Sequence, residues 1–359
     1  MKIVALVLAG GEGSRLYPLT AEHAKPALQF ANGYRIIDFV LSNLVNSKIS
    51  TVYVLAQHKP ASLISHIESA WAPWLAGSQG MIKVLLPRSN TLGGHYKGTA
   101  DAVYQQLELL QAHSPDLVAV FAADHVYRMD LRQMAAFHRT RDAEVTIASV
   151  PVPVEHASSF GIVSTGADGR VRDFREKPAA PPTIPGDPSR VFASMGNYLF
   201  DPATLEKLLK ESRRLGDTDF GRDILPRIAG RSRVYAYDFA ANHVPGVQEH
   251  EERGYWRDVG TLTALAAAQQ DTMGPRPRFN LWNRSWPIRG EHDAALLAKL
   301  RDWQEHAATA AVEPEPSSIE TTSIGTTSIG TTAGEQLRPA PAWRVSGTDR
   351  RIDEPLHPS

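Results

Sequence analysis

Continuous apolar runs are the strongest pattern in the first half of the chain. Residues 3–9 (IVALVLA) and 117–122 (LVAVFA) contain no polar side chain. Runs of this length that end at a turn signal are typical of strands buried on both faces, as in the centre of a parallel sheet. Shorter or more mixed runs predict three further strands, at residues 51–57, 82–86 and 144–150.

Segments with apolar residues at helical spacing separate these runs. The spacing predicts helices over residues 37–46, 60–69, 98–113 and 130–139. Alternation of strand and helix over the first 150 residues indicates parallel strands that are joined by crossover helices. The expected fold class is therefore α/β.

The pattern changes after residue 151. Short runs predict strands of a mixed or antiparallel extension at residues 161–163, 170–174, 192–200 and 233–239, and helices at 202–213, 221–228 and 261–270. A Pro-rich loop at residues 178–188 interrupts them. We expect a single domain over residues 1–289, with a parallel-rich mixed sheet and flanking helices.

The C-terminal part of the chain has a different composition. Residues 290–306 form a charged amphipathic stretch, which predicts a helical extension, and residues 307–359 contain the segment TSIGT twice. Such a tract has too few apolar groups to offset the entropic cost of ordering its backbone. Residues 307–359 are therefore predicted to be a disordered tail.

Composition narrows the class of protein. The 359 residues are 42% hydrophobic and carry a net charge of −1, which argues against nucleic acid as a partner. The chain has no Cys, so disulfides and thiolate metal sites are excluded. No apolar run approaches the roughly 18 residues that a membrane span needs. The start of the chain imitates a signal peptide, but its apolar run is at the lower limit of length; a buried strand and a cytoplasmic protein are expected.

A glycine loop follows the first predicted strand. It contains Gly10, Gly11 and Gly13, and Arg15 stands at its exit. Glycines let backbone N–H groups turn toward an anion, and a guanidinium suits phosphate oxygens. Position 16 is Leu rather than Gly, and no Gly-Lys-Ser/Thr triplet occurs, so this is neither a dinucleotide fingerprint nor a P-loop. The loop predicts a polyphosphate site, although a glycine turn without a ligand remains open.

Two carboxylates are candidates for a metal site. Asp124 directly follows the run at 117–122 and could hold Mg²⁺, or it could cap a following helix. Asp258 could complete the same site, pair with its neighbour Arg257, or cap the helix near residue 261. His125 is expected to be a hydrogen-bonding neighbour of this site.

Other segments could bind the organic parts of a nucleotide or a sugar. Glu176 and Lys177 end a predicted strand and could bind sugar hydroxyls and phosphate, or form a surface ion pair. Gly98 opens a helix of small residues, which fits either close approach of a ligand or tight helix–sheet packing. Tyr96 could stack on a base.

These motifs together resemble one family. In order and separation they are similar to those of the sugar-nucleotide pyrophosphorylases, and most closely of bacterial glucose-1-phosphate adenylyltransferases. The resemblance extends from residue 3 to about residue 289 and rests on LAGGEGSRL, AKPAL, RIIDFVLSN, HYKGTADAV, ADHVY, PVPVEHASSFG, REKP, SMGNYLF, DFGRDILP, YWRDVGT and NRSWPI.

The resemblance implies a nucleotidyltransferase-type, Rossmann-like fold and a transferase reaction of carbohydrate metabolism. ATP and glucose 1-phosphate would give ADP-glucose and pyrophosphate for glycogen or α-glucan synthesis, with Mg²⁺ as cofactor; a homo-oligomer is left open. By position, the implied catalytic residues are Arg15, Lys25 and Asp124, and the implied metal ligands are Asp124 and Asp258. The implied nucleotide-binding residues are Gly10, Gly11, Gly13, Tyr96 and Gly98, and the implied sugar-phosphate-binding residues are Gly161, Glu176, Lys177 and Ser194.

The chain departs from the family pattern at three places. Ala123 replaces a usual Gly, and the added methyl group is expected to be tolerated. Glu22 stands where many bacterial members have the lysine that binds a phosphorylated activator, so that control is not expected. After WPI, no hexapeptide repeats of the family's left-handed β-helix follow. Two alternatives therefore stay open: a non-catalytic regulatory subunit or paralogue that binds nucleotide or sugar phosphate, and a pyrophosphorylase for another base or sugar.

Overall fold

The computed structural model describes residues 1–31, 33–72, 80–88 and 94–291. The predicted helical extension at 290–306, beyond its first two residues, and the predicted tail at 307–359 lie outside the described residues. The domain expected at residues 1–289 falls within one compact unit that extends from Met1 to Thr309.

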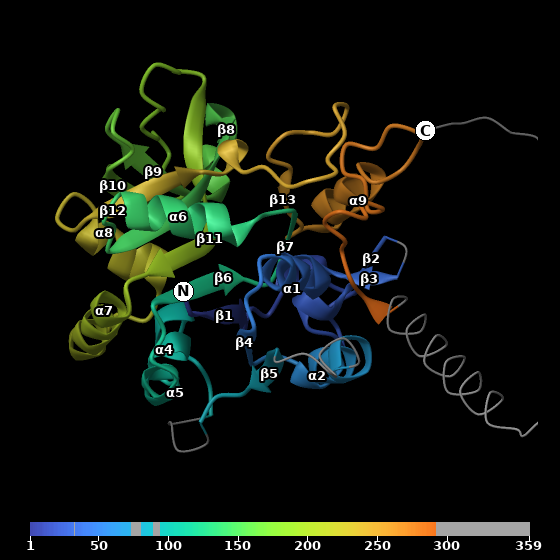
Figure 1. Ribbon diagram of the computed structural model, residues 1–359, viewed down its shortest axis with the longest axis horizontal. Helices are drawn as coiled ribbons and strands as arrows, with labels where there is room; N and C mark the ends of the chain where they lie inside the picture. Colours follow the sequence, from blue (N-terminus) through green and yellow to red (C-terminus); the bar gives the residue numbers. More distant parts are fainter. Residues whose placement is uncertain (32, 73–79, 89–93, 292–359) are drawn as a thin grey trace, which may run out of the picture. The chain divides into compact units, whose positions relative to one another are not determined.

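A nine-stranded sheet forms the centre of this unit (Figure 1). Its parallel half has the order β6–β1–β4–β5, with bounds Leu117–Ala122, Ile3–Ala9, Thr51–Ala56 and Met81–Leu85. β1 pairs with both β4 and β6, so it is a central strand as its apolar run predicts. Its alternate residues enter two cores: Ala5 and Val7 face one, and Val4 and Leu6 face the other.

The second half of the sheet is mixed, as expected. β11 (Arg190–Phe200) runs antiparallel to β6 and to β8 (Val145–Pro153), and β12 (Val234–Asp238) runs parallel to β8. β9 (Gly161–Thr165) and β10 (Val171–Glu176) form an antiparallel pair, and β9 also pairs antiparallel with β11. The prediction of a parallel-rich sheet with an antiparallel extension is confirmed.

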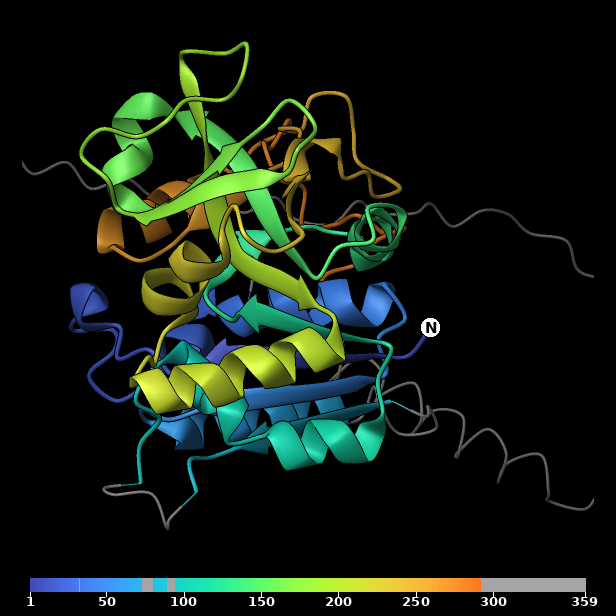
Figure 2. The same cartoon turned by 90° about the vertical axis from the view of Figure 1, so that its left-hand side faces the viewer.

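Helices cover both faces of the sheet. The core on one face contains residues of α1 (Ile36–Asn46), α2 (Pro60–His66) and α6 (Leu131–Thr140). The opposite core contains residues of α4 (Thr99–Tyr104), α5 (Leu107–His113) and α7 (Pro202–Leu215), and Figure 2 shows α5 and α7 in front of the parallel strands. α8 (Leu225–Ile228) and α9 (Leu262–Gln270) complete the set that the sequence predicts. Among the described residues, no helix has the length and apolar character needed to cross a membrane.

The prediction of one long helix over residues 98–113 is wrong. The segment forms two helices, α4 and α5, which are separated at Gln105 and Gln106. Both side chains are buried, and the Gln105 amide oxygen accepts a hydrogen bond from the backbone N–H of Arg88 at 3.0 Å. The inward-facing polar side chain serves a neighbouring loop, which the apolar spacing on either side did not indicate.

Two short ribbons have no counterpart among the predicted elements. β2 (Gln29–Phe30) pairs with β3 (Tyr34–Arg35), and β7 (His125–Tyr127) pairs with β13 (Trp256–Asp258). Strands of two or three residues are too short to show a period-2 pattern. The second ribbon nevertheless brings together two distant parts of the chain that both carry candidate site residues.

Candidate active site

A cavity of about 630 Å³ opens at the carboxyl ends of β1 and β6. This is the edge at which open α/β sheets bind their ligands. All but one of the candidate catalytic, substrate-binding and metal-binding residues line it: Gly10, Gly11, Arg15, Lys25, Tyr96, Gly98, Asp124, Gly161, Glu176, Lys177, Ser194 and Asp258. The fold therefore gathers loops from both halves of the sheet around one space.

Gly13 is the candidate that lies outside this lining. Its φ of +70° requires glycine, and a Cβ there would lie 3.0 Å from both Lys25 Cβ and Thr20 Cγ2. Its carbonyl accepts a hydrogen bond from Thr20 Oγ1 at 2.9 Å. Gly13 thus shapes the turn between Gly11 and Arg15, whereas its contact with a phosphate stays a prediction.

Lys25 joins the two candidate carboxylates. Its Nζ lies 2.7 Å from Asp124 Oδ2 and 3.2 Å from Asp258 Oδ1, and its side chain is only 8% exposed. Burial would raise the pKa of Asp124, but His125 and Lys25 outweigh this effect and lower that pKa to about 2. Asp124 is therefore ionised at neutral pH.

The alternative role of Asp124, as the cap of a following helix, is not observed. Asp124 leads into strand β7 rather than into a helix, and the N-cap of α6 is Asp130, whose carboxylate accepts from Arg132 N at 2.9 Å. The interpretation of Asp124 as a helix cap is therefore wrong.

The same holds for the alternatives at Asp258. Arg257 pairs with Glu252 and Asp271 instead, at 2.6 and 3.1 Å, and Thr261 caps α9. Asp258 thus contacts Lys25 of the cavity, and its neighbours have other partners.

The carboxylates meet the requirements of a divalent cation. One ligand atom each of Asp124, His125 and Asp258 can be chosen so that all three lie within 4.8 Å of one another. Carboxylate oxygens are the ligands that hard cations prefer. The donor set therefore fits a hard divalent metal ion.

One wall of the cavity is formed by the segment around Tyr96. The backbone N–H of Tyr96 donates to the side-chain oxygen of Gln57, and its hydroxyl donates to the Leu85 carbonyl at 3.4 Å. Tyr96 is 7% exposed, and burial raises its pKa to about 12. Gln57 and Thr99 also line the cavity; Thr99 lies in the motif HYKGTADAV, but the sequence analysis gave neither residue a role.

Gly98 packs directly against backbone. A Cβ at this position would lie 2.9 Å from the Thr218 carbonyl carbon and closer still to its oxygen. That oxygen accepts hydrogen bonds from Ala100 N at 2.9 Å and from Asp101 N at 3.3 Å. Tight packing is confirmed here, but the partner is the loop that precedes residue 220 rather than the sheet.

Another wall of the cavity carries the candidate sugar-phosphate residues. Glu176 pairs with Gly161 across β10 and β9, and a Cβ on Gly161 would lie 2.6 Å from Phe174 Cζ. Lys177 Nζ lies 3.5 Å from Glu176 Oε1 and its side chain is 60% exposed, so the surface ion pair exists, although both residues line the cavity. Ser194 lies 3.4 Å from the Tyr198 hydroxyl.

Aromatic and acidic residues that were given no binding role from the sequence complete the site. The His125 and Trp256 ring centroids are 4.9 Å apart, and those of Phe160 and Trp256 are 5.3 Å apart. Asp219 accepts from Thr99 Oγ1 at 2.9 Å and so links the two walls. Phe160, Trp256 and Asp219 lie in motifs that carry the family resemblance, but only the fold shows that they line the cavity.

Two departures from the family pattern can be located. Ala123 is fully buried in the core beside the site and its N–H donates to the Leu8 carbonyl at 3.1 Å, so its methyl group is accommodated as expected. Glu22 is exposed. The expected loss of activation through Glu22 stays a prediction.

A glycine loop, two basic residues and two carboxylates at one sheet edge fit a nucleotidyl-transfer site. The family model for nucleotidyl transferases matches residues 4–274, and the chain belongs to this family. It is 47% identical over 302 residues to the glucose-1-phosphate adenylyltransferase of Thermodesulfovibrio yellowstonii, covering 84% of this chain and 74% of that protein. It is 49% identical over 294 residues to the protein of the same name from Anaeromyxobacter dehalogenans, covering 80% and 70%. It is 47% identical over 301 residues to the glucose-1-phosphate adenylyltransferase of Mycolicibacterium smegmatis, and the match covers 83% of this chain and 74% of that protein.

Proposed function

We propose that the chain is a glucose-1-phosphate adenylyltransferase, which converts ATP and glucose 1-phosphate into ADP-glucose and pyrophosphate for glycogen or α-glucan synthesis. The observation that carries the proposal is the single cavity that joins the glycine loop, Lys25 with its two carboxylates, and the Glu176–Lys177 pair. The names of the relatives support the same substrates. Both substrates are metabolites of the cytoplasm, where we place the reaction.

The reaction exchanges one phosphoanhydride bond for another. A phosphate oxygen of glucose 1-phosphate forms a bond to the α-phosphorus of ATP, the bond from that phosphorus to the bridging oxygen breaks, and pyrophosphate leaves. The attacking oxygen is already ionised at neutral pH, so no general base is needed. The protein contributes orientation and stabilisation of the charge that develops on the leaving group.

The basic residues at the sheet edge would supply that stabilisation. Arg15 and Lys25 would contact the triphosphate, with the backbone N–H groups of Gly10 and Gly11 beside it. Lys25 is held by two carboxylates and is nearly buried, so little reorganisation is needed when the charge develops. Tyr96 and Gly98 would lie near the adenine.

The wall with Glu176 and Lys177 would hold the sugar phosphate. Lys177 would bind its phosphate, Glu176 would accept hydrogen bonds from sugar hydroxyls, and Ser194 and Gly161 would border the sugar. These residues line the same cavity as the glycine loop, so both substrates could be held in one space, as a direct attack between them requires.

We further propose Mg²⁺ as the cofactor, held by Asp124 and Asp258. When bound, it would neutralise charge on the phosphate oxygens. The lowered pKa of Asp124 keeps its carboxylate ionised at neutral pH, so it need not release a proton to act as a ligand.

The test is release of pyrophosphate from the purified full-length chain with ATP, glucose 1-phosphate and Mg²⁺. Turnover that is lost with GTP or UTP in place of ATP, and with other sugar 1-phosphates, supports the proposal. A folded protein that binds ATP but never releases pyrophosphate refutes it and favours a regulatory subunit.

A further inference from the structure

The ribbon of β7 and β13 carries both candidate metal ligands at one end. Asp258 lies opposite His125, next to Asp124, and Trp256 lies opposite Tyr127 at the other end. A two-stranded ribbon of three residues per strand does not hold its own geometry. Contacts from outside the ribbon must therefore fix how far apart the two carboxylates lie.

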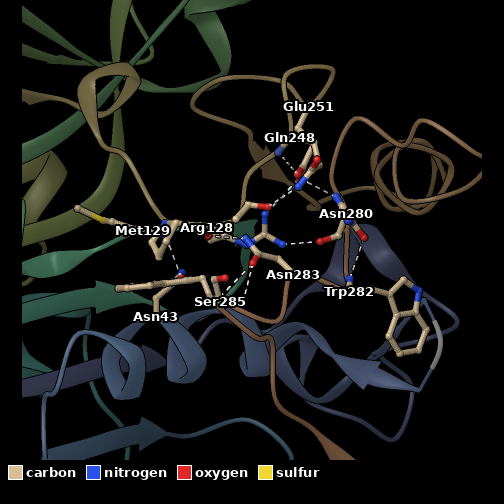
Figure 3. Close-up of polar contacts among 12 residues, drawn as sticks. Asn43, Arg128, Met129, Gln248, Glu251, Asn280, Trp282, Asn283 and Ser285 are labelled. Atoms are coloured by element: carbon tan, nitrogen blue, oxygen red, sulfur yellow. Dashed lines mark hydrogen bonds and ion pairs between the residues drawn. The ribbon is translucent and has the colours of Figure 1, made fainter.

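A buried ion pair closes the far end of this ribbon. Arg128 directly follows β7, and Glu251 precedes β13; Arg128 Nη1 lies 3.2 Å from Glu251 Oε2, and their side chains are 4% and 2% exposed. Arg128 Nη2 also donates to the Asn280 carbonyl at 2.5 Å, and its guanidinium lies 4.4 Å from the centre of the Phe279 ring. Figure 3 shows the guanidinium between the loop that carries Glu251 and the segment that carries Asn280.

Glu251 is fixed by more than this pair. Its Oε1 accepts from Gln248 N at 2.8 Å and its Oε2 accepts from Asn280 N at 2.9 Å. Arg128 and Glu251 lie outside the lining of the cavity, so neither of them contacts a substrate there. The pair thus connects the exit of one strand to the entry of its partner.

Asn43 of α1 holds the backbone on both sides of Arg128. Its Nδ2 donates to the Tyr127 carbonyl at 3.1 Å and its Oδ1 accepts from Met129 N at 2.9 Å. The side chain is 1% exposed, so these bonds have no competition from water. Asn43 therefore fixes the backbone position of Arg128, from which its side chain extends.

The segment Phe279–Arg289, named here the C-terminal strap, ties this network to α1. Trp286 Nε1 donates to Asn43 Oδ1 at 3.4 Å, Asn46 Nδ2 donates to the Pro287 carbonyl at 2.9 Å, and Arg289 N donates to Ser42 Oγ at 2.8 Å. The strap thereby links helix α1 to the loop before β13.

We propose that Arg128 and Asn43 are positioning residues for the metal ligands. They set the register and spacing of the β7–β13 ribbon from its far end, and with it the separation of Asp124 and Asp258. This inference rests on the metal site of the proposed function. Breaking a buried ion pair leaves an unpaired buried charge, and we expect the residues around it, including the ribbon, to move in response.

The test compares metal binding with stability in the full-length chain. Arg128→Lys keeps the charge but loses the planar fork, and Glu251→Gln keeps the shape but loses the charge. Binding of Mn²⁺, used in place of Mg²⁺ with a non-cleavable ATP analogue, is followed by electron paramagnetic resonance. The Mg²⁺ concentration for half-maximal rate is measured beside it. We expect the dissociation constant for Mn²⁺ and the Mg²⁺ concentration for half-maximal rate each to rise on the order of 10-fold, as for other residues that support metal ligands.

Arg227→Lys is the matched control. Arg227 also binds two carboxylates, of Glu211 and Asp217, at 2.7 and 3.0 Å, but it belongs to α8 and has no contact with the ribbon among the described residues. It should lower the melting temperature and leave Mn²⁺ affinity unchanged.

Each outcome decides the matter. Unchanged Mn²⁺ affinity in folded Arg128→Lys or Glu251→Gln, with only a lower melting temperature, overturns the inference and leaves a purely structural ion pair. If Arg128→Lys does not fold, Glu251→Gln and Asn43→Ser decide in the same way. A wild-type chain that binds Mn²⁺ but releases no pyrophosphate refutes the proposed function and not the positioning; one that binds no Mn²⁺ overturns the positioning.

Discussion

The close approach of Gly98 to Thr218 makes a substitution with a calculable effect. In Gly98→Ala, the new methyl group would overlap the Thr218 carbonyl, and backbone rather than a flexible side chain would have to move. Moving this carbonyl weakens its hydrogen bonds from Ala100 N and Asp101 N, which begin helix α4. It would also shift the neighbouring residue Asp219, which accepts a hydrogen bond from Thr99 in the cavity wall.

The expected cost follows from these contacts. Two hydrogen bonds contribute about 0.5–1.5 kcal/mol each, and overpacking costs about 1–3 kcal/mol. Because the two descriptions overlap, we expect a loss of about 2–3 kcal/mol in the free energy of unfolding. That is a large part of a typical stability of about 5–15 kcal/mol, but the protein should still fold.

Urea unfolding at constant slope measures this loss, and Gly11→Ala is the matched control. A Cβ on Gly11 would have no heavy atom within 4 Å, so this variant should keep its stability while the Michaelis constant for ATP rises. Gly98→Ala should lose stability and weaken binding of both substrates. An unchanged midpoint in Gly98→Ala would refute the argument, since the carbonyl would then have room to yield.

Three further predictions concern single side chains. Asp124→Asn should lower turnover by about 10² or more with little loss of stability, because it removes charge beside the reacting phosphates; an unchanged rate contradicts its role. Lys177→Ala should raise the Michaelis constant for glucose 1-phosphate about tenfold and leave that for ATP unchanged, since an exposed charged contact contributes about 1.5 kcal/mol. Burial lowers the pKa of His138 below 6.5, so the folded state favours the neutral ring and its contribution to stability falls as pH drops below 6.5. His138→Asn should remove that part of the loss, at most about 1.4 kcal/mol per pH unit, in unfolding measured from pH 7 to pH 5; equal slopes in both proteins would contradict it.

The sequence was most informative where burial imposes a regular pattern. β1 and β6 are found where their apolar runs predict them, because every residue of a central parallel strand is covered on both sides. Asp124 could be located at the sheet edge because it directly follows such a run. The same reasoning failed for the helix at 98–113, because Gln105 turns inward to bond a loop that lies elsewhere in the sequence.

The contacts that shape the site are non-local and carry no periodic signal. The β7–β13 ribbon pairs three residues with three, and its partners Asn43, Glu251 and Asn280 come from separate parts of the chain. Asp219 lies in the motif DFGRDILP, but its place in the cavity depends on a contact with Thr99, which is distant in the sequence. A resemblance to a family could name the ligands, but only the folded chain shows what holds them.

The ribbon also has a consequence for synthesis of the protein. A ribosome makes Asp124 early, together with the parallel strands that place it, but Asp258 and the strap that secures the ribbon emerge only near the end of the described chain. The nine-stranded sheet is complete once β12 has been made, shortly before Asp258, and the strap is made after both. The strap also brings the buried side chains of Phe279, Leu281 and Ile288 against α1, so an interrupted translation product should lack both a secured ribbon and the part of the core that these side chains fill.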